Sequence, residues 1–178
     1  MFGLRMGLVV GGILGGCILT GCGKKPPQMD LRVAADRVRD SWALTRATAT
    51  SVIMTDPNIP GRSAEWVPLA TFALDWCDSP GELVIQDGRL LVLHGEHDVV
   101  DGVRSVKLWP DMDSETDQFF KVQLEHTAGQ RLRELAAVNR GRMLVIIRDG
   151  RAVNVVKIWP DMKFGDEYLL YLPKTESP

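Results

Sequence analysis

The chain has 178 residues and an almost balanced charge, since 21 Lys and Arg face 23 Asp and Glu for a formal net charge of −2. A protein that binds nucleic acid is expected to carry a basic excess, often gathered into one patch. The composition therefore argues against a nucleic-acid partner.

The N-terminus has the pattern of a secretory signal. Arg5 precedes an apolar run of fourteen residues, 6–19, which leads into Leu19-Thr20-Gly21-Cys22. As a helix this run reaches about 21 Å, which is less than the roughly 30 Å hydrocarbon core of a bilayer. A short basic region, an apolar stretch and small residues before a cut site predict a signal peptide over residues 1–21 rather than a membrane-spanning helix.

The ending Leu-Thr-Gly-Cys resembles the lipobox of bacterial lipoproteins. The resemblance implies that the Cys22 thiol receives a diacylglycerol, that the peptide is cut before Cys22, and that the new amine is acylated. Two or more acyl chains, at about 0.8 kcal/mol per buried CH₂, hold a protein firmly on a membrane. Residues 22–29 are then a lipidated tether, which Pro26-Pro27 stiffens. We expect the mature protein on the exported side of the cell membrane or the outer membrane.

The cysteines predict no intrachain disulfide in the mature chain. Cys17 lies in the leader and Cys22 is predicted to carry lipid, which leaves Cys77 alone. The mature chain must therefore rely on its apolar core, and 157 residues (178 − 21) suffice for one domain of ordinary size. Beside Trp76, Cys77 is expected to be a small buried hydrophobe rather than a reactive thiol.

The first part of the mature chain, residues 30–81, gives mixed signals. Apolar residues from Leu31 to Trp42 recur at helical spacing behind Asp30, which predicts a helix with Asp30 as its N-cap. Residues 48–56 are rich in β-branched side chains and predict a strand. Residues 59–68 are predicted to form a loop, and periodicity does not assign the apolar run 69–77.

Residues 82–173 give clearer signals. Asp87-Gly88 and Asp149-Gly150 each separate two apolar runs, which predicts two hairpins with tight turns. Further strands are predicted over residues 103–109, 119–124 and 168–172.

A helix is expected between these strands. Thr127-Ala128-Gly129-Gln130 fits a capping box at its start, and Asn139-Arg140-Gly141 predicts a left-handed end. The order of strands and helices predicts α+β architecture, with an antiparallel or mixed sheet and helices packed on one face.

Two nearly identical heptapeptides, Val-Lys-Leu-Trp-Pro-Asp-Met at 106–112 and Val-Lys-Ile-Trp-Pro-Asp-Met at 156–162, stand fifty positions apart. The predicted helix between them has no counterpart before the first copy, which argues against duplication of a whole domain. We expect both copies to be strands of one sheet. Period-2 alternation then places their lysine and tryptophan side chains on one face: Lys107, Trp109, Lys157 and Trp159.

If the two strands adjoin, the lysine stems pack against the tryptophan rings on this Lys–Trp face. Structural packing is the favoured interpretation. The alternative is an interaction surface, since half-exposed tryptophan is common where partner proteins dock.

Residues 119–160 resemble the head part of the large periplasmic domain of SecD, the membrane partner of the bacterial protein-export channel. The positions that match the family pattern are Leu124, Thr127, Gly129, Leu132, Leu135, Asn139, Gly141, Leu144, Ile146, Asp149, Gly150, Val153 and Pro160. Pro160 lies farther from Asp149-Gly150 than the family's proline does, and the transmembrane helices of SecD have no counterpart here. The resemblance implies a ferredoxin-like α+β domain over residues 82–173 and a role in gripping protein segments, without proton-coupled export.

One cluster suggests metal or acid–base chemistry, the run His94-Gly95-Glu96-His97-Asp98. Imidazoles and carboxylates are zinc ligands, but the helical His-Glu-x-x-His motif spaces its histidines four apart and here the spacing is three. Gly95 also disfavours a helix, so a solvated turn is the favoured interpretation. A metal-dependent hydrolase using His94, His97 and Asp98 is the alternative.

No Gly-x-Ser-x-Gly nucleophile motif is present, and no cofactor is expected. The sequence thus predicts a lipid-anchored, non-enzymatic protein-interaction module at the cell envelope. A protein partner would add to a sheet edge or dock on the Lys–Trp face. A purely structural envelope lipoprotein is a further alternative.

Overall fold

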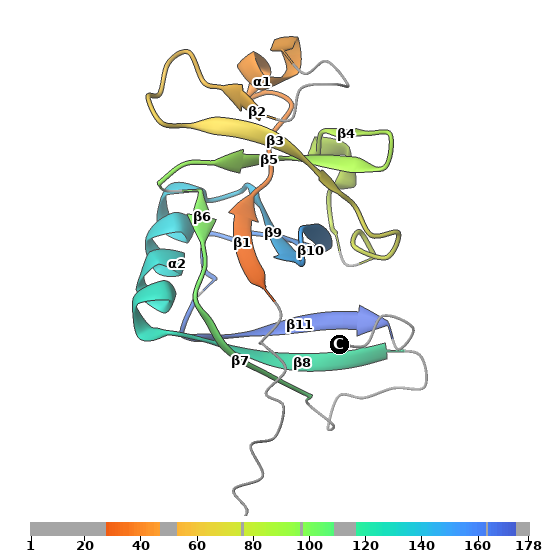
Figure 1. Cartoon of the computed structure of the whole chain (residues 1–178), viewed down its shortest axis with the longest axis vertical. Helices are drawn as coiled ribbons and strands as arrows, with labels where there is room; N and C mark the ends of the chain where they lie inside the picture. Colours follow the sequence, from red (N-terminus) through yellow and green to blue (C-terminus); the bar gives the residue numbers. More distant parts are fainter. Residues whose placement is uncertain are drawn as a thin grey trace, which may run out of the picture.

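The computed structural model describes residues 28–46, 53–75, 77–96, 98–108, 117–162 and 164–173. Within these residues the strands pair in antiparallel fashion into three sheets, stacked along the long axis of the molecule (Figure 1). The described residues are mostly antiparallel strands with few helices, which is consistent with the expected α+β class. The predicted signal peptide, residues 1–21, and Cys22 lie outside the described residues.

The central sheet has the strand order β10-β9-β1-β6. Its strands are β1 (Met29–Val33), β6 (Val99–Val100), β9 (Met143–Arg148) and β10 (Arg151–Lys157). The first five residues of β9 are all buried, as expected where both faces of a strand are covered. Leu144 and Ile146 belong to one hydrophobic cluster, whereas Val145 and Ile147 belong to another. The central sheet is therefore buried on both sides.

An upper sheet, with the order β2-β3-β5-β4, covers one face. Its strands are β2 (Ile53–Thr55), β3 (Ser63–Pro68), β4 (Ile85–Gln86) and β5 (Arg89–His94). Leu90 and Val92 of β5 pack in the cluster that contains Val145 and Ile147. A short helix α1 (Ser41–Arg46) and a 3₁₀ turn η1 (Pro80–Glu82) complete this part of the molecule.

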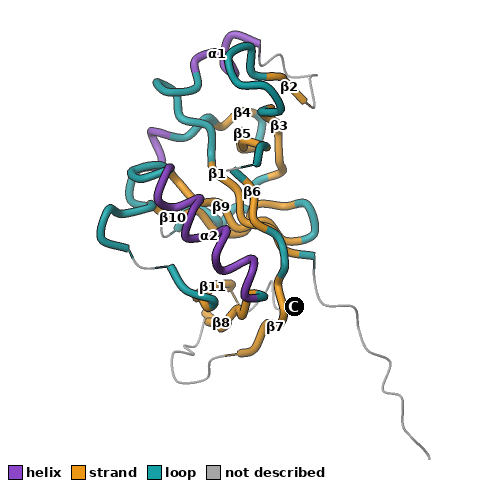
Figure 2. Tube along the Cα trace, turned by 90° about the vertical axis from the view of Figure 1, so that its left-hand side faces the viewer, coloured by secondary structure: helices purple, strands orange, loops and turns teal. Residues whose placement is uncertain are grey.

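A lower sheet and the long helix α2 (His126–Val138) cover the other face. The lower sheet has the order β11-β8-β7, with β7 (Val103–Leu108), β8 (Asp117–Leu124) and β11 (Glu167–Pro173). Leu132 of α2 and Val122 of β8 share a cluster with Leu144 and Ile146. Figure 2 shows α2 lying across the central sheet and reaching the lower sheet. No helix in the described ranges has the length and apolar character needed to cross a membrane.

Both predicted hairpins are confirmed. β4 pairs with β5 around Asp87-Gly88, and β9 pairs with β10 around Asp149-Gly150. In each turn both residues have positive φ, 49° and 69° in the first and 50° and 76° in the second. This is the two-residue turn that Asp-Gly favours, because its twist matches that of the flanking strands.

The helix predicted from Asp30 to Trp42 is wrong except at its last two residues, because α1 begins only at Ser41. Residues Met29 to Val33 form β1, which pairs with β9 on one side and β6 on the other. Leu31 and Val33 are fully buried while Asp30 and Arg32 are not, so the chain alternates with the period of a strand. Pairing along both edges outweighs the helical spacing of the local sequence. Met29 also belongs to the sheet rather than to the predicted tether.

Two further local predictions are wrong. Within the predicted loop 59–68, Ser63–Pro68 is strand β3, paired with β5 from Ser63↔His94 to Pro68↔Arg89. Helix α2 begins at His126 with Glu125 as N-cap and no side-chain cap, so Thr127 lies inside the helix and forms no capping box. The N–H of Glu125 donates to the carbonyl of Gly102 (2.9 Å), and the helix begins two residues earlier than the motif predicts. The predicted C-terminal end of α2 is confirmed, with Asn139 as C-cap and Gly141 at φ 75°.

The strands occupy three sheets rather than the single sheet predicted. Gly102, at φ 101°, turns the chain out of β6 in the central sheet and into β7 of the lower sheet. Only glycine adopts such an angle readily. Strands from both sides of the boundary predicted at residue 81 pair with each other, β3 with β5 and β1 with β9.

Candidate functional site

The two heptapeptide copies lie in different sheets, so the prediction that they are strands of one sheet is wrong. The first copy begins in β7, at the edge of the lower sheet, and the second begins in β10, at the edge of the central sheet. Lys107 is exposed and lies opposite Lys121 of β8, whereas Trp109 lies outside the described residues. The described strands β7 and β10 are therefore not neighbours in one sheet.

In the second copy the lysine and tryptophan interact with each other. Lys157 Nζ lies 5.3 Å from the centroid of the Trp159 ring, within the range of a cation–π contact. The same ammonium lies 3.2 Å from Glu82 Oε1. Ile158 between them is 1% exposed and points into the core, while Trp159 remains 47% exposed. The alternation predicted from the sequence is present here, within one copy.

Trp159 borders a groove of about 380 Å³ between α2 and the segment that follows β10. We call it the Trp159 groove, and its lining residues are Arg133, Ala136, Ala137, Arg140, Ile158, Trp159, Pro160, Met162 and Phe164. Two alanines on α2 leave space that longer side chains would fill. Tryptophan, methionine and arginine are the residue types most enriched where proteins bind one another.

Backbone hydrogen bonds hold this segment beside the end of α2. The N–H of Gly141 donates to the carbonyl of Ile158, and the N–H of Ile158 donates to the carbonyl of Arg142, each at 2.8 Å. The N–H of Met162 donates to the carbonyl of Trp159 (3.1 Å), which closes a turn. Trp159 is thus presented from a fixed backbone, so little ordering entropy opposes its binding to a partner.

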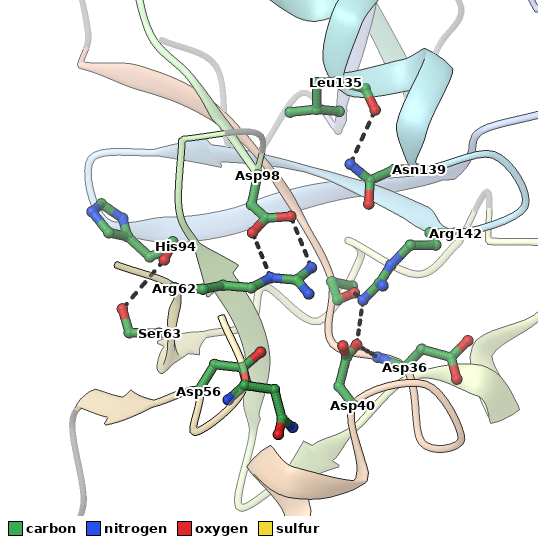
Figure 3. Close-up of polar contacts among 12 residues, drawn as sticks. Asp36, Asp40, Asp56, Arg62, Ser63, His94, Asp98, Leu135, Asn139 and Arg142 are labelled. Carbon is green, nitrogen blue, oxygen red and sulfur yellow. Dashed lines mark hydrogen bonds and ion pairs between the residues drawn. The ribbon is translucent and has the colours of Figure 1, made fainter. Parts of the chain in front are cut away.

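A second candidate is a cleft of about 510 Å³ between the upper sheet and the end of α2, with Arg62, Asp98 and Arg142 in its lining. Figure 3 shows two separate ion pairs there. The Arg62 guanidinium donates from Nε (2.7 Å) and Nη2 (3.0 Å) to the two oxygens of Asp98. Arg142 Nη2 donates to Asp40 Oδ2, which also accepts from the N–H of Asp36 at 2.7 Å.

These pairs neutralise Arg62, Asp98 and Arg142. Burial by itself lowers the pKa of Arg62, but its hydrogen bonds and ion pair with Asp98 raise that pKa above its ordinary value. The Asp98 carboxylate is only 6% exposed. A carboxylate held by a guanidinium in this way is not available as a general base or a metal ligand.

The predicted metal cluster gains no support from this geometry. His94 is exposed at the end of β5, and its carbonyl accepts from Ser63 Oγ at 3.4 Å. Asp98 binds Arg62, and His97 lies outside the described residues. Among the residues that the structure describes, no three His, Cys, Asp or Glu side chains are placed to hold a metal ion.

Cys77 is half-buried and packs against the cluster formed by Leu83, Leu90 and Met143. Burial raises the pKa of its thiol above the ordinary value, which keeps the thiol protonated and unreactive. Trp76, which precedes Cys77 in the sequence, lies outside the described residues.

The functional residues that sequence patterns missed are the arginines. Arg62 meets Asp98 across 36 positions and Arg142 meets Asp40 across 102, so no local spacing indicates either pair. Arg133 and Arg140 reach the Trp159 groove only because α2 packs beside the segment after β10. The chain matches no protein-family model, and no curated protein matches it either.

Proposed function

We propose that this chain is a non-enzymatic bacterial lipoprotein, held to the cell envelope through Cys22, whose folded domain binds another protein in the Trp159 groove. The observation that carries the proposal is the 47% exposure of Trp159 in the lining of a preformed groove that Arg133 and Arg140 also line. Tryptophan and arginine are the side chains most often found at the energetic centres of protein interfaces.

The anchor is supported by the sequence Leu19-Thr20-Gly21-Cys22 and by the point where the folded domain begins. The carbonyl of Gln28 accepts from the N–H of Asp149 (2.8 Å), so the domain starts at the β9–β10 turn. The six residues from Cys22 to Pro27 span at most about 20 Å when extended. Acylation at Cys22 would thus hold this turn near the bilayer, on the exported side of the cell membrane or the outer membrane.

The likeness to the SecD head, and the ferredoxin-like arrangement that it implies, are part of the same proposal. They apply to the unit β8–α2–β9–β10, which has the expected strand–helix–hairpin order. The likeness rests on this order alone, because β8 lies in the lower sheet whereas β9 and β10 lie in the central sheet. A role in gripping protein segments fits the Trp159 groove, because α2 and the end of β10 form it.

The sequence is also compatible with two other functions. A metal-dependent hydrolase using His94, His97 and Asp98 would require Asp98 to leave its two hydrogen bonds with Arg62. A purely structural envelope lipoprotein requires no preformed groove. The interaction module accounts for the exposed Trp159, which the two alternatives leave without a role.

Photo-crosslinking in cells tests the docking site. A photoreactive amino acid at position 159 of the full chain is expected to capture a discrete partner, whereas the same residue at Val38, which is 85% exposed, is expected to capture none. Ala137→Arg fills the groove from α2 and should abolish capture from position 159. Equal capture at positions 159 and 38, or capture that survives Ala137→Arg, would contradict docking in the groove and favour the structural alternative.

A further inference from the structure

A second cavity lies next to the Trp159 groove and shares Met162 and Phe164 with it. Its volume is about 290 Å³, and Tyr168 of β11 also lines it. Its inner wall is apolar and comes from the central sheet and α2, through Leu31, Leu132, Leu144 and Ile146, each at most 2% exposed. The cavity therefore lies between the central sheet, α2 and the lower sheet, with the exposed residues Met162 and Glu167 on its outer side.

The lining has two polar side chains, those of Glu167 and Tyr168, and the buried one is that of Tyr168. Its oxygen is buried, and no described residue offers it a hydrogen bond. Buried hydroxyl groups in native proteins are nearly always paired, so an unpaired one calls for a partner from outside the chain. Burial, and then the negative charge of Asp30, raise the pKa of Tyr168 well above its ordinary value. The hydroxyl consequently stays protonated and able to donate.

The charges around the cavity select the kind of molecule that fits. Glu167 lines it, and its carboxylate pairs with Lys121 Nζ at 2.6 Å. Asp30, whose charge acts on Tyr168, pairs with Arg32 Nε, also at 2.6 Å. An anion in the cavity would be repelled by both carboxylates. A cation would lose its hydration shell without gaining an ion pair, because both carboxylates already have partners. A neutral molecule meets neither penalty.

We propose that this cavity binds a small, uncharged, apolar molecule whose single hydrogen-bond acceptor, an alcohol, ester or amide oxygen, receives the Tyr168 hydroxyl proton. The volume lies at the lower end of the range for ligand pockets, roughly 300 to 1,000 Å³, so the ligand is of fragment size. A medium-chain alcohol has the right chemistry. The site does not depend on the lipid anchor or on the Trp159 groove.

Titration calorimetry of the purified full chain with 1-octanol tests the site, with octanoate as the charged counterpart. We expect octanol to bind saturably at a single site and octanoate to bind at least tenfold more weakly. Val156→Phe places a ring in the cavity from the edge strand β10 and should abolish saturable binding. Octanol also partitions into detergent or lipid, but to the same extent for every variant. The difference in octanol binding between wild type and Val156→Phe therefore measures binding in the cavity alone.

Tyr168→Phe provides the second arm of the test, since it removes only the hydroxyl. Octanol affinity should fall about fivefold to tenfold, the worth of one hydrogen bond. Without octanol, the Tm of Tyr168→Phe should equal or exceed that of wild type. Three results would each overturn the proposal: no saturable octanol binding to wild type, equal affinity in Tyr168→Phe, or a lower Tm in Tyr168→Phe, which would mean that a protein group already pairs with the hydroxyl.

Discussion

At the residue scale, Asp40 and Arg142 form an ion pair in the interior. The carboxylate is 2% exposed and the guanidinium 8%, so both charges have left water. Such a pair repays its desolvation only when further hydrogen bonds satisfy it. Asp40 has such a bond from the N–H of Asp36, and Arg142 has a longer one, 3.4 Å, to the carbonyl of Ala34.

Removing one partner of this pair should therefore be costly. We expect Asp40→Ala to lower the free energy of unfolding by about 3–5 kcal/mol, because Arg142 stays charged and uncompensated in the interior. The double variant Asp40→Leu with Arg142→Met should lose much less, since it buries no charge. Urea unfolding of both variants measures the difference. A loss below about 1 kcal/mol in Asp40→Ala would show that water reaches the pair in solution.

Asp36 gives a pH-dependent prediction. Partial burial by itself raises the pKa of its carboxyl, but the N–H groups of Arg39 (2.9 Å) and Val38 (2.8 Å) together lower that pKa below its ordinary value. A lowered folded pKa stabilises the fold at pH above the unfolded value, about 3.9, and the stabilisation disappears as the pH falls through the folded pKa.

We therefore expect Asp36→Ala to cost about 1 kcal/mol at pH 7, the usual net worth of such hydrogen bonds. The gap between wild type and variant should close as the pH falls below about 4, because protonation then removes the same interaction from wild type. Urea unfolding at pH 7 and at pH 3 makes the comparison. An equal gap at both pH values would assign the effect to packing rather than to the charge.

At the element scale, α2 contains a glycine whose role is contact rather than flexibility. A Cβ built on Gly129 would overlap Asp166 Oδ1 and lie 3.1 Å from the Asp166 Cα. Asp166 accepts a hydrogen bond from Arg133 Nη1 at 3.2 Å, and its carbonyl accepts from the N–H of Leu124 at 2.7 Å. Gly129 thus allows the chain before β11 to pack directly on the helix.

Gly129→Ala is expected to destabilise the protein, although alanine in a helix interior is normally better than glycine by about 1 kcal/mol. Val138→Ala, at an exposed position of the same helix, is the matched control and should be nearly neutral. Thermal unfolding of the two variants and of wild type compares their Tm values. A Gly129→Ala variant with a raised Tm would mean that the segment before β11 does not rest on α2.

The elements that could be predicted from the sequence are those whose cause is local. The Asp-Gly turns at 87–88 and 149–150 impose their own geometry, and Gly141 ends α2 where the sequence predicts. β1 and β3 were missed because their partners, β9 and β5, come from distant parts of the chain. The same distinction applies to the candidate site. The exposure of Trp159 follows from local alternation along the strand, whereas the Arg62–Asp98 pair joins distant residues and no local pattern indicates it.

At the scale of the whole molecule, β1 connects the layers. It pairs with β9 and β6 in the central sheet, and the residue after it, Ala34, bridges to Val92 of the upper sheet. Without β1, the edge of β9 would be unpaired and Leu31 and Val33 would leave holes in the core. The folded unit is therefore expected to span both sides of residue 81.

This arrangement predicts that residues 82–173 alone do not fold, although they contain the segment that resembles the SecD head. Residues 28–173 should unfold in a single cooperative transition, with circular dichroism and tryptophan fluorescence giving the same midpoint. The shorter fragment should show no such transition. A stable, cooperatively unfolding 82–173 fragment would restore the two-part division predicted from the sequence.

The central claim is that acyl chains on Cys22 hold this β-rich domain at a membrane, where the Trp159 groove meets its partner. Mass spectrometry of the polypeptide extracted from cell membranes tests it most directly. We predict a chain that begins at Cys22, lacks residues 1–21, and carries the added mass of a diacylglycerol and an amide-linked acyl group. A chain that retains Met1 and bears no lipid would contradict the anchor and the setting proposed for its function.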